Sequence, residues 1–514
     1  MVNESNSNDK VIRDLAHGYI TLDEFFQKLV DNKHFQRLRY IKQLTCQHVY
    51  PSANHTRFEH SLGVYYLSRR YFKAIKRQLI ESGDVDEKSF ENMLFNLSVA
   101  ALLHDVGHAP LSHLGEKYFN VRKIKKAFEV ECDGRNIAYK DICACKGAAP
   151  HELMSCYIIV KYFYNIILQE KAKEHDVDFE LICRMIVGAT YNTDSKWFED
   201  LAIGVLNSST IDMDKLDYII RDPLMTGISV PRIDVTRFFR GLKYKKETHK
   251  VVILKQAITV VQNIIDTRDC LYLLVCNHHV TVYTDFIIEF YIKHLMLMHD
   301  KGQLAITEDS LDANDYFSCD AIGEKLVTDG DLLCKLKEYY NKNKNFSPYT
   351  QVITPQIFER KFLAPLWKDL YSFNMFQEKY IGDTYKVEDM LKKMCDNEDY
   401  IYRRYIAREI NNKLKLTHGN IFIVPRSNKF YMDNPNNKFY IYVNDCLKKI
   451  SELLPQKYYG NLHSGAAFYV YGPKEHINEV REAFVEVIKR GLPSKDKIDY
   501  PESIPNWLKD SEDD

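Results

Sequence analysis

Apolar residues recur at helical spacing through most of the first three hundred positions of the chain. The clearest segments, with an apolar residue every three or four positions, are 58–75, 92–104, 153–168 and 258–297. This pattern predicts a mainly α fold with a helical core over residues 9–300. The period is lost between 133 and 150, where glycine and proline appear, and this predicts a surface insertion between two helices.

The pattern changes in the second half of the chain. Residues 307–355 mix charged and Asn-rich sequence and are expected to be irregular, with helices resuming near Ile357. Alternating β-favouring residues in NIFIVP, KFYIYVND and AAFYVYG predict strands, and segments 445–454 and 477–491 predict helices. We therefore expect a disordered N-terminus (1–8), the helical core (9–300, with the 133–150 insertion), a helical extension with an irregular segment (301–415), a smaller α+β lobe (416–495) and an acidic tail (496–514).

Composition narrows the class of protein. The formal net charge of -1 gives no global reason to expect nucleic acid as the main partner, so nucleic-acid binding stays a secondary possibility. No apolar run approaches the roughly 20 residues of a membrane helix, so we expect an intracellular protein, cytoplasmic or nuclear, without membrane contact. The 12 cysteines form no CxxC pair, which favours reduced structural thiols over disulfides or a zinc knuckle.

Ionisable residues interrupt the most apolar helix of the core. The run LSVAALL leads directly into His104 and Asp105, and burial of such a pair is expensive unless both are bound. His108 and His113 follow within ten positions, and His104 and His108 share a helix face if the helix continues that far. With His60 in HTRFEHSLGV, these residues offer imidazole and carboxylate ligands. Such a set suits Fe, Mn, Zn, Ni or Mg.

A further carboxylate lies in STIDMDKLDYIIRD. Asp214, Tyr218 and Asp222 are four residues apart and form a polar stripe on one expected helix, for which Ser208 to Thr210 offer N-caps. Apolar neighbours indicate that this stripe faces a cavity. Asp214 is therefore the expected fourth metal ligand, and Asp212 is the alternative, because the sequence does not fix the phase of the helix.

The order His60, His104-Asp105, Asp214 resembles the H...HD...D signature of HD-domain phosphohydrolases. FQRLRYIKQL (35–44), HTRFEHSLGV (55–64), LLHDVGHAPLSH (102–113), His151-Glu152 and DMDKLDYIIRD (212–222) resemble the HD-domain deoxynucleoside triphosphate triphosphohydrolases, a family with vertebrate and bacterial members. The resemblance covers roughly residues 9 to 290. It implies an HD-domain core and metal-dependent hydrolysis of a dNTP to a deoxynucleoside and inorganic triphosphate.

The resemblance also implies roles for individual residues. His113 would protonate the leaving 5′-oxygen, Glu116, where relatives usually carry aspartate, would orient it, and His108 or His151 would complete the acid/base set. Substrate contacts carried over from the family are Arg57, Lys215 and Arg268 for phosphate, and Gln43, Leu44, Tyr218, Asp222 and Tyr272 for the sugar or base. Tyr272 and Cys276 stand where the vertebrate members have a histidine and a tyrosine, so base or sugar recognition is expected to differ.

A regulatory site is implied as well. The positions that match activating-nucleotide contacts of the vertebrate members are Lys10, Val11, Asp31, Gln36, Arg39 and Arg237. They imply GTP or dNTP as activator and a nucleotide-bridged homo-oligomer, with a tetramer favoured. The alternatives are another HD phosphohydrolase, either a nucleoside monophosphatase or a phosphodiesterase on cyclic or oligomeric nucleotides, and a nucleotide-sensing or nucleic-acid-binding scaffold.

Overall fold

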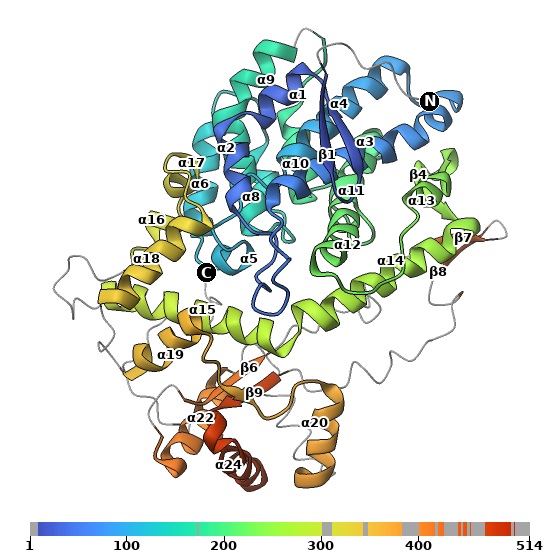
Figure 1. Ribbon diagram of the computed structural model, residues 1–514. Coiled ribbons are helices and arrows are strands. Elements are labelled where there is room, and N and C mark those ends of the chain that lie inside the picture. The colour runs from blue at the N-terminus through green and yellow to red at the C-terminus, as the bar shows by residue number, and fades with distance from the viewer. Residues whose placement is uncertain are drawn as a thin grey trace. The chain divides into compact units, whose positions relative to one another are not determined.

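The computed structural model describes residues 9–171, 174–300, 311–342, 348–382, 400–416, 420–425, 440–443, 446–449, 453, 468–494 and 498. The described fold is mainly α, as the sequence predicts (Figure 1). The chain divides into two compact units. Unit 1 comprises Met1–Leu271, Ala313–Leu332 and Tyr431–Pro455, and unit 2 comprises Tyr272–Asp312, Leu333–Phe430 and Gln456–Asp514.

Unit 1 holds the helical core. Its helices are α1 Glu24–Val30, α2 Lys33–Gln36, α3 Arg57–Glu81, α4 Glu87–Leu103, α5 His113–Glu116, α6 Val121–Cys132, α7 Tyr139–Cys143, α8 Pro150–Ile158, α9 Tyr164–Lys171, α10 Phe179–Val187, α11 Trp197–Leu206, α12 Met213–Thr226, α13 Val235–Arg240, α14 Ile258–Leu271, α16 Asn314–Phe317 and α17 Cys319–Gly323. Its strands are β1 Lys10–Asp14, β2 Gly18–Leu22, β3 Leu242–Lys245, β4 Lys250–Leu254, β7 Tyr440–Val443 and β8 Cys446–Lys449. Helix α18, Asp329–Lys342, begins in unit 1 and continues in unit 2.

Unit 2 contains helices α15 His279–Asp300, α19 Pro348–Glu359, α20 Leu370–Phe376, α22 Tyr400–Leu414 and α24 Ile477–Arg490, and strands β5 Ala364–Pro365, β6 Phe422–Pro425 and β9 Phe468–Gly472. The strands form an antiparallel sheet in the order β5-β9-β6. Trp367 is buried against Phe373 and Phe468. No helix in the described part of the chain is long and apolar enough to cross a membrane.

Helix α4 is the centre of unit 1. Asp86 caps its N-terminus by accepting a hydrogen bond from the Ser89 amide, and the run Leu97 to Leu103 is completely buried. Helices α3, α10 and α11 pack against it (Figure 1). The apolar surface of α4 therefore faces protein on every side, as its sequence predicts. His104 and Asp105 of the predicted metal motif directly follow its C-terminal end.

Most of the predicted elements are confirmed. Helices α3, α4 and α24 and strands β6, β7 and β9 lie where the pattern places them. The helix expected over 153–168 is continuous but passes through a π turn at Ile159–Phe163. The helix expected over 258–297 is two helices, α14 and α15, separated by a π turn at Tyr272–Cys276 and residues 277–278.

Two predictions of local structure are wrong. Segment 445–454 was expected to be helical, but its described residues 446–449 form β8, which pairs antiparallel with β7, and β7 extends the β3-β4 sheet in parallel; the rest of the segment, apart from 453, lies outside the described residues. Pairing with a preformed sheet outweighs the weak helical preference of a short polar segment. Within 307–355, which was expected to be irregular, α16, α17, α18 and α19 are helical.

The remaining differences concern loops and ends. The 133–150 insertion contains the short helix α7. This helix packs on the rest of the protein through Ile142, which is fully buried. Helix α4 ends at Leu103, so His104 and His108 do not share one helix face as the continuing helix would have required. The predicted disordered ends, 1–8 and 496–514, lie outside the described residues apart from 498.

Candidate functional site

Four side chains from three segments of unit 1 converge at the end of α4. His60 comes from α3, His104 and Asp105 follow the last residue of α4, and Asp214 lies in the first turn of α12. The His60 Nε2 atom lies 3.0 Å from Asp214 Oδ1 and 3.7 Å from Asp105 Oδ2. The His104 Nε2 atom lies 3.4 Å from Asp105 Oδ1 and 3.9 Å from Asp214 Oδ1. The structure thus brings the four predicted metal ligands together.

The two histidines are held so that Nε2 faces the centre of this cluster. His104 Nδ1 lies 2.9 Å from the Ala101 carbonyl, which can only accept a hydrogen bond, so Nδ1–H donates and Nε2 is the nitrogen that faces the cluster. That Nε2 atom is buried and has no hydrogen-bond partner among the described residues. His60 Nδ1 likewise faces a carboxylate, at 2.7 Å from Asp217 Oδ2. An orphaned imidazole nitrogen beside two carboxylates fits a divalent metal well.

Electrostatics support the same interpretation. Burial opposes ionisation of Asp105, but His104 and the Arg57 guanidinium, 2.9 Å away, hold the pKa of Asp105 well below its ordinary value. Burial also opposes ionisation of Asp214, and His60 holds its pKa low. Both carboxylates are therefore anionic at neutral pH. The Asp214 side chain is 41% exposed while that of Asp105 is 2% exposed, so the cluster opens on the Asp214 side.

Asp212, the alternative ligand, has another role in the structure. Its carboxylate accepts hydrogen bonds from the amides of Lys215 and Ser208 and forms an ion pair with the Lys215 ammonium. It is the N-cap of α12, in place of Ser208 to Thr210, which the sequence had suggested as caps. These contacts engage both oxygens of Asp212, whereas Asp214 Oδ1 lies near His60 and His104, and this leaves Asp214 as the better candidate.

A second cluster lies beside the first. Glu116 bridges two histidines, because its Oε1 lies 2.6 Å from His113 Nδ1 and its Oε2 lies 2.5 Å from His151 Nδ1. The rings of His108 and His151 stack with centroids 4.0 Å apart, and His108 Nε2 lies 3.2 Å from Asp105 Oδ1. Although burial opposes it, the two histidines hold the pKa of Glu116 well below its ordinary value. His108, His113, Glu116 and His151 are thus brought together as predicted, and Asp105 links them to the metal cluster.

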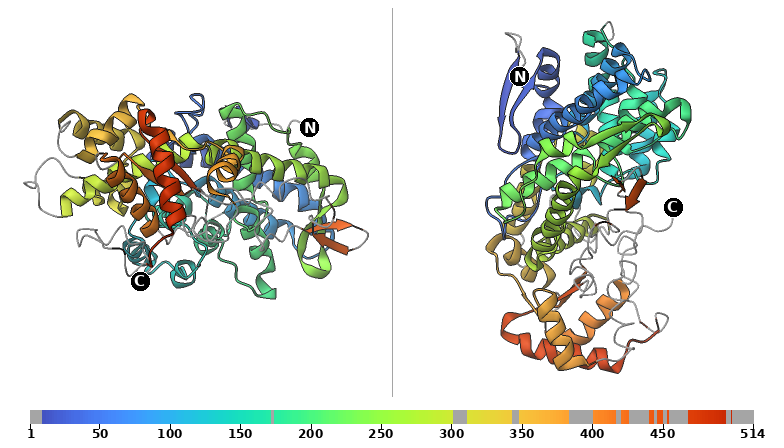
Figure 2. Two further views of the ribbon diagram at one scale, coloured as in Figure 1. Left: turned by 90° about the horizontal axis from the view of Figure 1, so that it is seen from below. Right: turned by 90° about the vertical axis from the view of Figure 1, so that its right-hand side faces the viewer.

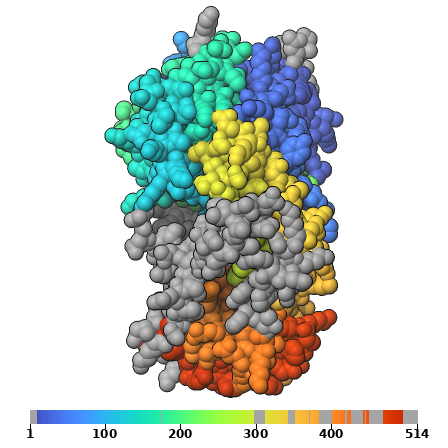
Figure 3. All heavy atoms as spheres, turned by 90° about the vertical axis from the view of Figure 1, so that its left-hand side faces the viewer, coloured from blue at the N-terminus to red at the C-terminus, as the bar shows by residue number. Residues whose placement is uncertain are grey.

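The backbone that carries His113 is strained. Leu111 and Ser112 both have positive φ angles, 62° and 53°, which residues with a side chain rarely adopt. Asp329 holds this loop by accepting hydrogen bonds from the amides of Leu111 (2.7 Å) and Lys42 (2.8 Å). Arg37 donates to the His108 carbonyl at 2.5 Å. Figure 3 shows the yellow segment that precedes Asp329 lying against blue and cyan residues of unit 1.

The predicted substrate residues are placed less uniformly. Arg57 is buried and bound to Asp105 and to Ser112 Oγ, so its observed partners belong to the metal cluster and its loop. Lys215 is bound to Asp212 and to the Ser208 carbonyl. Asp222 is paired with His55 at 2.8 Å. Gln43 is buried and Leu44 half-buried, Tyr218 and Arg268 lie on α12 and α14, and Tyr272 begins the π turn in unit 2.

The predicted regulatory residues form separate pairs. Lys10 Nζ lies 3.4 Å from Asp31, and Arg39 Nε donates to Gln36 Oε1 at 2.8 Å. Val11, on the same strand as Lys10, is 51% exposed. Arg237, on α13, donates to the Gln256 carbonyl. The positions other than Arg237 lie within the first forty residues of the chain.

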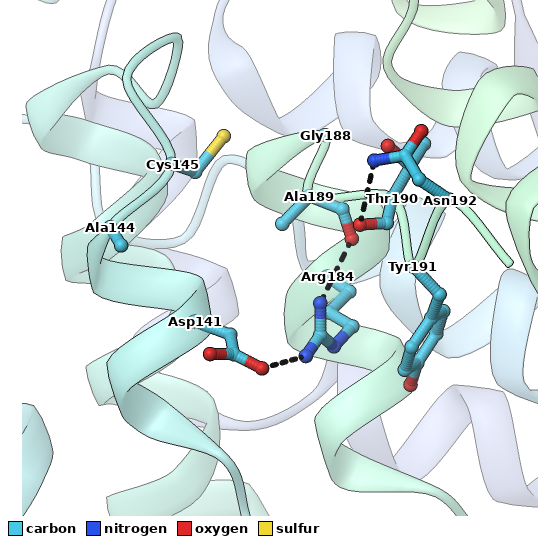
Figure 4. A pocket seen from close by; sticks show the side chains of 9 residues that line it. All are labelled: Asp141, Ala144, Cys145, Arg184, Gly188, Ala189, Thr190, Tyr191 and Asn192. Carbon is cyan, nitrogen blue, oxygen red and sulfur yellow. Dashed lines mark hydrogen bonds and ion pairs between the residues drawn. The ribbon is translucent and has the colours of Figure 1, made fainter.

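An open hollow of about 390 Å³ lies between the insertion and α10 (Figure 4). Asp141 of α7 and Arg184 of α10 form an ion pair across it at 2.8 Å, and residues 188–192 complete its wall. Arg184 also binds Glu180, so its charge is already balanced. None of the predicted site residues lines this hollow.

Residues that the sequence analysis did not select complete the site. Asp217 bonds to His60, His17 bonds to Asp217, His55 pairs with Asp222, and Asp329 holds the strained loop. Asp217 and His55 stand inside the motifs quoted above, and the position of Asp217 amid apolar neighbours was the available signal. His17 and Asp329 carry no local signal, because their partners are remote in sequence.

Comparison with known proteins places this geometry in context. Residues 57–186 match the family model of the HD domain. The chain is 29% identical to a Dictyostelium discoideum protein named deoxynucleoside triphosphate triphosphohydrolase SAMHD1 homolog over 287 residues, which are 55% of this chain and 49% of that protein. It is 24% identical to human SAMHD1, a deoxynucleoside triphosphate triphosphohydrolase, over 474 residues, which are 87% of this chain and 69% of the human protein.

A solved structure shares the fold. A phosphohydrolase from Bacteroides thetaiotaomicron superposes with a TM-score of 0.60 at 19% identity, over 90% of this chain and 99% of that one. The chain spans only about half the length of the Dictyostelium relative. Together the HD-domain match, these relatives and the His/Asp cluster support a metal-dependent phosphohydrolase.

Proposed function

We propose that this chain, which carries an HD domain and resembles the HD-domain deoxynucleoside triphosphate triphosphohydrolases, hydrolyses dNTPs to deoxynucleosides and inorganic triphosphate. The observation that carries the proposal is the pairing of two clusters. His60, His104, Asp105 and Asp214 offer four ligands for a divalent metal, and the Glu116-bridged histidines lie directly beside them. Hydrolysis of a phosphoric ester needs both an electrophilic centre and a proton donor.

The metal would be held by His60 Nε2, His104 Nε2 and the carboxylates of Asp105 and Asp214. It would supply Lewis-acid polarisation of an α-phosphate oxygen and an activated water. His104 and Arg57 lower the pKa of Asp105, and the Arg57 guanidinium donates a hydrogen bond to Asp105 Oδ2. The exposed side of Asp214 leaves room for the phosphate to approach, as a catalytic metal centre requires.

His113 is the proposed general acid. In the imidazolium form of His113, Nδ1–H donates a hydrogen bond to Glu116 and Nε2–H can pass its proton to the departing 5′-oxygen. The second oxygen of Glu116 binds His151, so this carboxylate is fixed from both sides. His113 has a 65% exposed side chain and can therefore reach a bound substrate.

The residues proposed to bind the substrate are those that match substrate contacts of the HD-domain dNTP triphosphohydrolases. Arg268 and Lys215 would contact the phosphates, together with Arg57. Gln43, Leu44, Tyr218, Asp222 and Tyr272 would surround the sugar and base. The Asp222 carboxylate is already oriented by His55, which supports a fixed acceptor for a sugar hydroxyl. Lys10, Val11, Asp31, Gln36, Arg39 and Arg237 would bind an activating GTP or dNTP between subunits of a homo-oligomer, with a tetramer favoured.

Product analysis tests the reaction. The purified protein is loaded with Mn²⁺ and incubated with each of the four dNTPs, with and without GTP, and in parallel with a nucleoside monophosphate and a cyclic dinucleotide. We expect inorganic triphosphate and deoxynucleoside from the dNTPs. Release of phosphate or pyrophosphate alone, or turnover only of the other substrates, would establish a different HD phosphohydrolase.

A substitution tests the metal centre. Asp105→Ala should lose both bound metal and activity, whereas Asp141→Ala, a change in the hollow away from the site, should keep both. Activity that survives Asp105→Ala at normal metal occupancy would contradict the ligand assignment. Absence of turnover by the wild-type protein on every substrate, despite full metal occupancy, would favour a nucleotide-sensing scaffold.

A further inference from the structure

Asp217 is a completely buried carboxylate behind the proposed metal centre, and the proposed reaction does not use it. Four hydrogen-bond donors surround it. Its Oδ1 lies 2.5 Å from His17 Nε2 and 3.0 Å from Arg221 Nη2, and its Oδ2 lies 2.7 Å from His60 Nδ1 and 2.8 Å from Arg221 Nε. Each oxygen therefore accepts two hydrogen bonds, which is the full capacity of a carboxylate in this plane.

The hydrogen bond from His60 to Asp217 decides which nitrogen of the His60 imidazole can bind a metal. An ionised carboxylate only accepts, so His60 Nδ1 must carry its proton and Nε2 must face the cluster. Arg221 forms an ion pair with Asp217 at 2.8 Å, and every partner of the two Asp217 oxygens is an N–H donor, so this carboxylate acts as an acceptor. A carboxylate in this position fixes both the tautomer and the direction of a metal-binding histidine.

Asp217 is in turn held by the turn between β1 and β2, 200 residues away in sequence. Asp14 accepts hydrogen bonds from the amides of Ala16 and His17, which shape the turn, and it binds Arg221 at 2.7 Å. Gly18 has a φ of +83°, which only glycine adopts readily, and this closes the turn behind His17. Figure 2 shows the hairpin in dark blue near the N-terminus.

The packing of α3 on α12 admits little movement of this network. A Cβ atom at Gly63, one turn after His60, would lie 1.9 Å from Asp217 Oδ1 and 2.5 Å from Arg221 Nη2. The absence of a side chain at position 63 lets the Asp217 carboxylate lie directly against α3. The His17 side chain is only 3% exposed, so the contact between the hairpin and Asp217 is closed to water.

We propose that Asp217 is a positioning residue for the metal ligand His60, and that the β1–β2 hairpin contributes to metal affinity through His17, which holds Asp217. The inference rests on the proposed metal centre and adds to it a part of the chain outside the HD-domain segment 57–186. It makes the hairpin turn a structural component of the centre.

Metal binding by the full-length protein tests the inference without any substrate. Each variant is stripped with EDTA and dialysed, and its affinity for Mn²⁺ is measured by titration calorimetry together with metal content. We expect Asp217→Asn to weaken Mn²⁺ binding by about 10- to 100-fold and His17→Ala by roughly tenfold. His17→Gln should restore affinity to within about threefold of wild type, because the Gln amide can donate from nearly the position of His Nε2.

Two further variants make the outcomes separable. Leu15→Ala changes a 70% exposed residue of the same turn and should bind Mn²⁺ like wild type. Asp214→Ala should bind little metal. If Asp214→Ala binds normally, the proposed metal centre itself is wrong. If Asp214→Ala loses metal while Asp217→Asn and His17→Ala bind like wild type, the centre stands and the role of the hairpin is overturned.

Folding is monitored in parallel by circular dichroism and thermal melting. Equal losses in His17→Gln and His17→Ala would overturn the hydrogen bond as the cause. If His17→Ala does not fold, the Mn²⁺ affinities of His17→Gln and Asp217→Asn, each compared with that of the wild type, still test the inference. The inference then requires weak binding in Asp217→Asn and nearly normal binding in His17→Gln.

Discussion

His60 lies between two carboxylates, Asp214 at Nε2 and Asp217 at Nδ1. Burial alone would lower its pKa, but the two carboxylates outweigh burial and raise the pKa of His60 to about 10. Without a bound metal the imidazole is therefore protonated at neutral pH. A metal at Nε2 must displace that proton.

The pH dependence of metal binding follows from this. Because the raised pKa keeps the proton bound below about pH 10, the apparent affinity for Mn²⁺ should rise with pH across the range 6.5 to 9, by up to roughly tenfold per unit. About one proton should be released for each metal bound. Calorimetry in buffers of different ionisation enthalpy measures both quantities. An affinity that is constant over this range would contradict the protonated state of His60.

Glu116 offers a second test at the level of one side chain. Its two oxygens bind two different histidines, so Glu116→Gln keeps the shape but replaces one acceptor with a donor. We expect kcat for dNTP hydrolysis to fall by on the order of 100-fold, because only one of the two histidines keeps an acceptor at Nδ1 and the negative charge between them is lost. Bound metal should be unchanged, since Glu116 is not a proposed ligand. A loss of metal equal to the loss of kcat would place Glu116 in the metal centre instead.

The sequence predicted residues whose chemistry is visible locally. His104 and Asp105 end an apolar run, and His113 and Glu116 are three residues apart, so the types of side chain and their spacing indicated a site. His17 and Asp217 meet only because the hairpin turn reaches α12. Such a contact depends on tertiary structure, and no spacing in the sequence encodes it.

The loop from Ala109 to Ser112, which leads to His113, is held in place by a residue at the start of α18. Its left-handed residues Leu111 and Ser112 place His113, and Asp329 at the start of α18 satisfies the Leu111 amide from across unit 1. Residues in this conformation each cost on the order of 1 kcal/mol or more, so the surrounding structure must hold them.

Removing that support gives a prediction. Asp329→Ala deletes the acceptor of two backbone amides, Leu111 and Lys42, and should lower the free energy of unfolding by about 2 to 3 kcal/mol. The value of kcat should also fall, because His113 is carried by the released loop. Urea unfolding and steady-state kinetics measure the two effects. Asp320→Ala, in the same segment with a 64% exposed side chain, is the matched control and should leave both unchanged.

Elements with strong apolar periodicity were predicted well, and short polar elements were not. Helices α3 and α4 follow from their sequence because burial of one face or of the whole helix leaves a regular pattern. Strand β8 has only four residues, and its structure depends on β7, which itself depends on β4. The pattern of CLKK alone therefore favoured the wrong structure.

All four proposed metal ligands belong to unit 1. A metal stabilises the fold that binds it by RT ln(1 + [L]/Kd), about 2.7 kcal/mol at a hundredfold excess over Kd. In scanning calorimetry, removal of metal with EDTA should therefore lower the melting temperature by several degrees. A melting temperature that EDTA does not change would contradict a metal bound by these four residues.

The state of the thiols gives a prediction for the whole chain. No disulfide joins the cysteines among the described residues, and that they are reduced stays a prediction. The melting temperature should therefore be the same with and without a reductant such as dithiothreitol. A drop of more than a few degrees on reduction would show a stabilising disulfide.

The uneven exposure of the four proposed ligands has a consequence for exchange kinetics. His60 and Asp105 are closed off from solvent, and Asp214 alone has a substantially exposed side chain. A chelator must then attack the metal from the Asp214 side, which is also the side from which a phosphate would enter. A bound substrate should consequently block access of the chelator to the metal. A non-hydrolysable dNTP analogue would then slow the removal of metal by EDTA, while the metal affinity of the free enzyme stays the same.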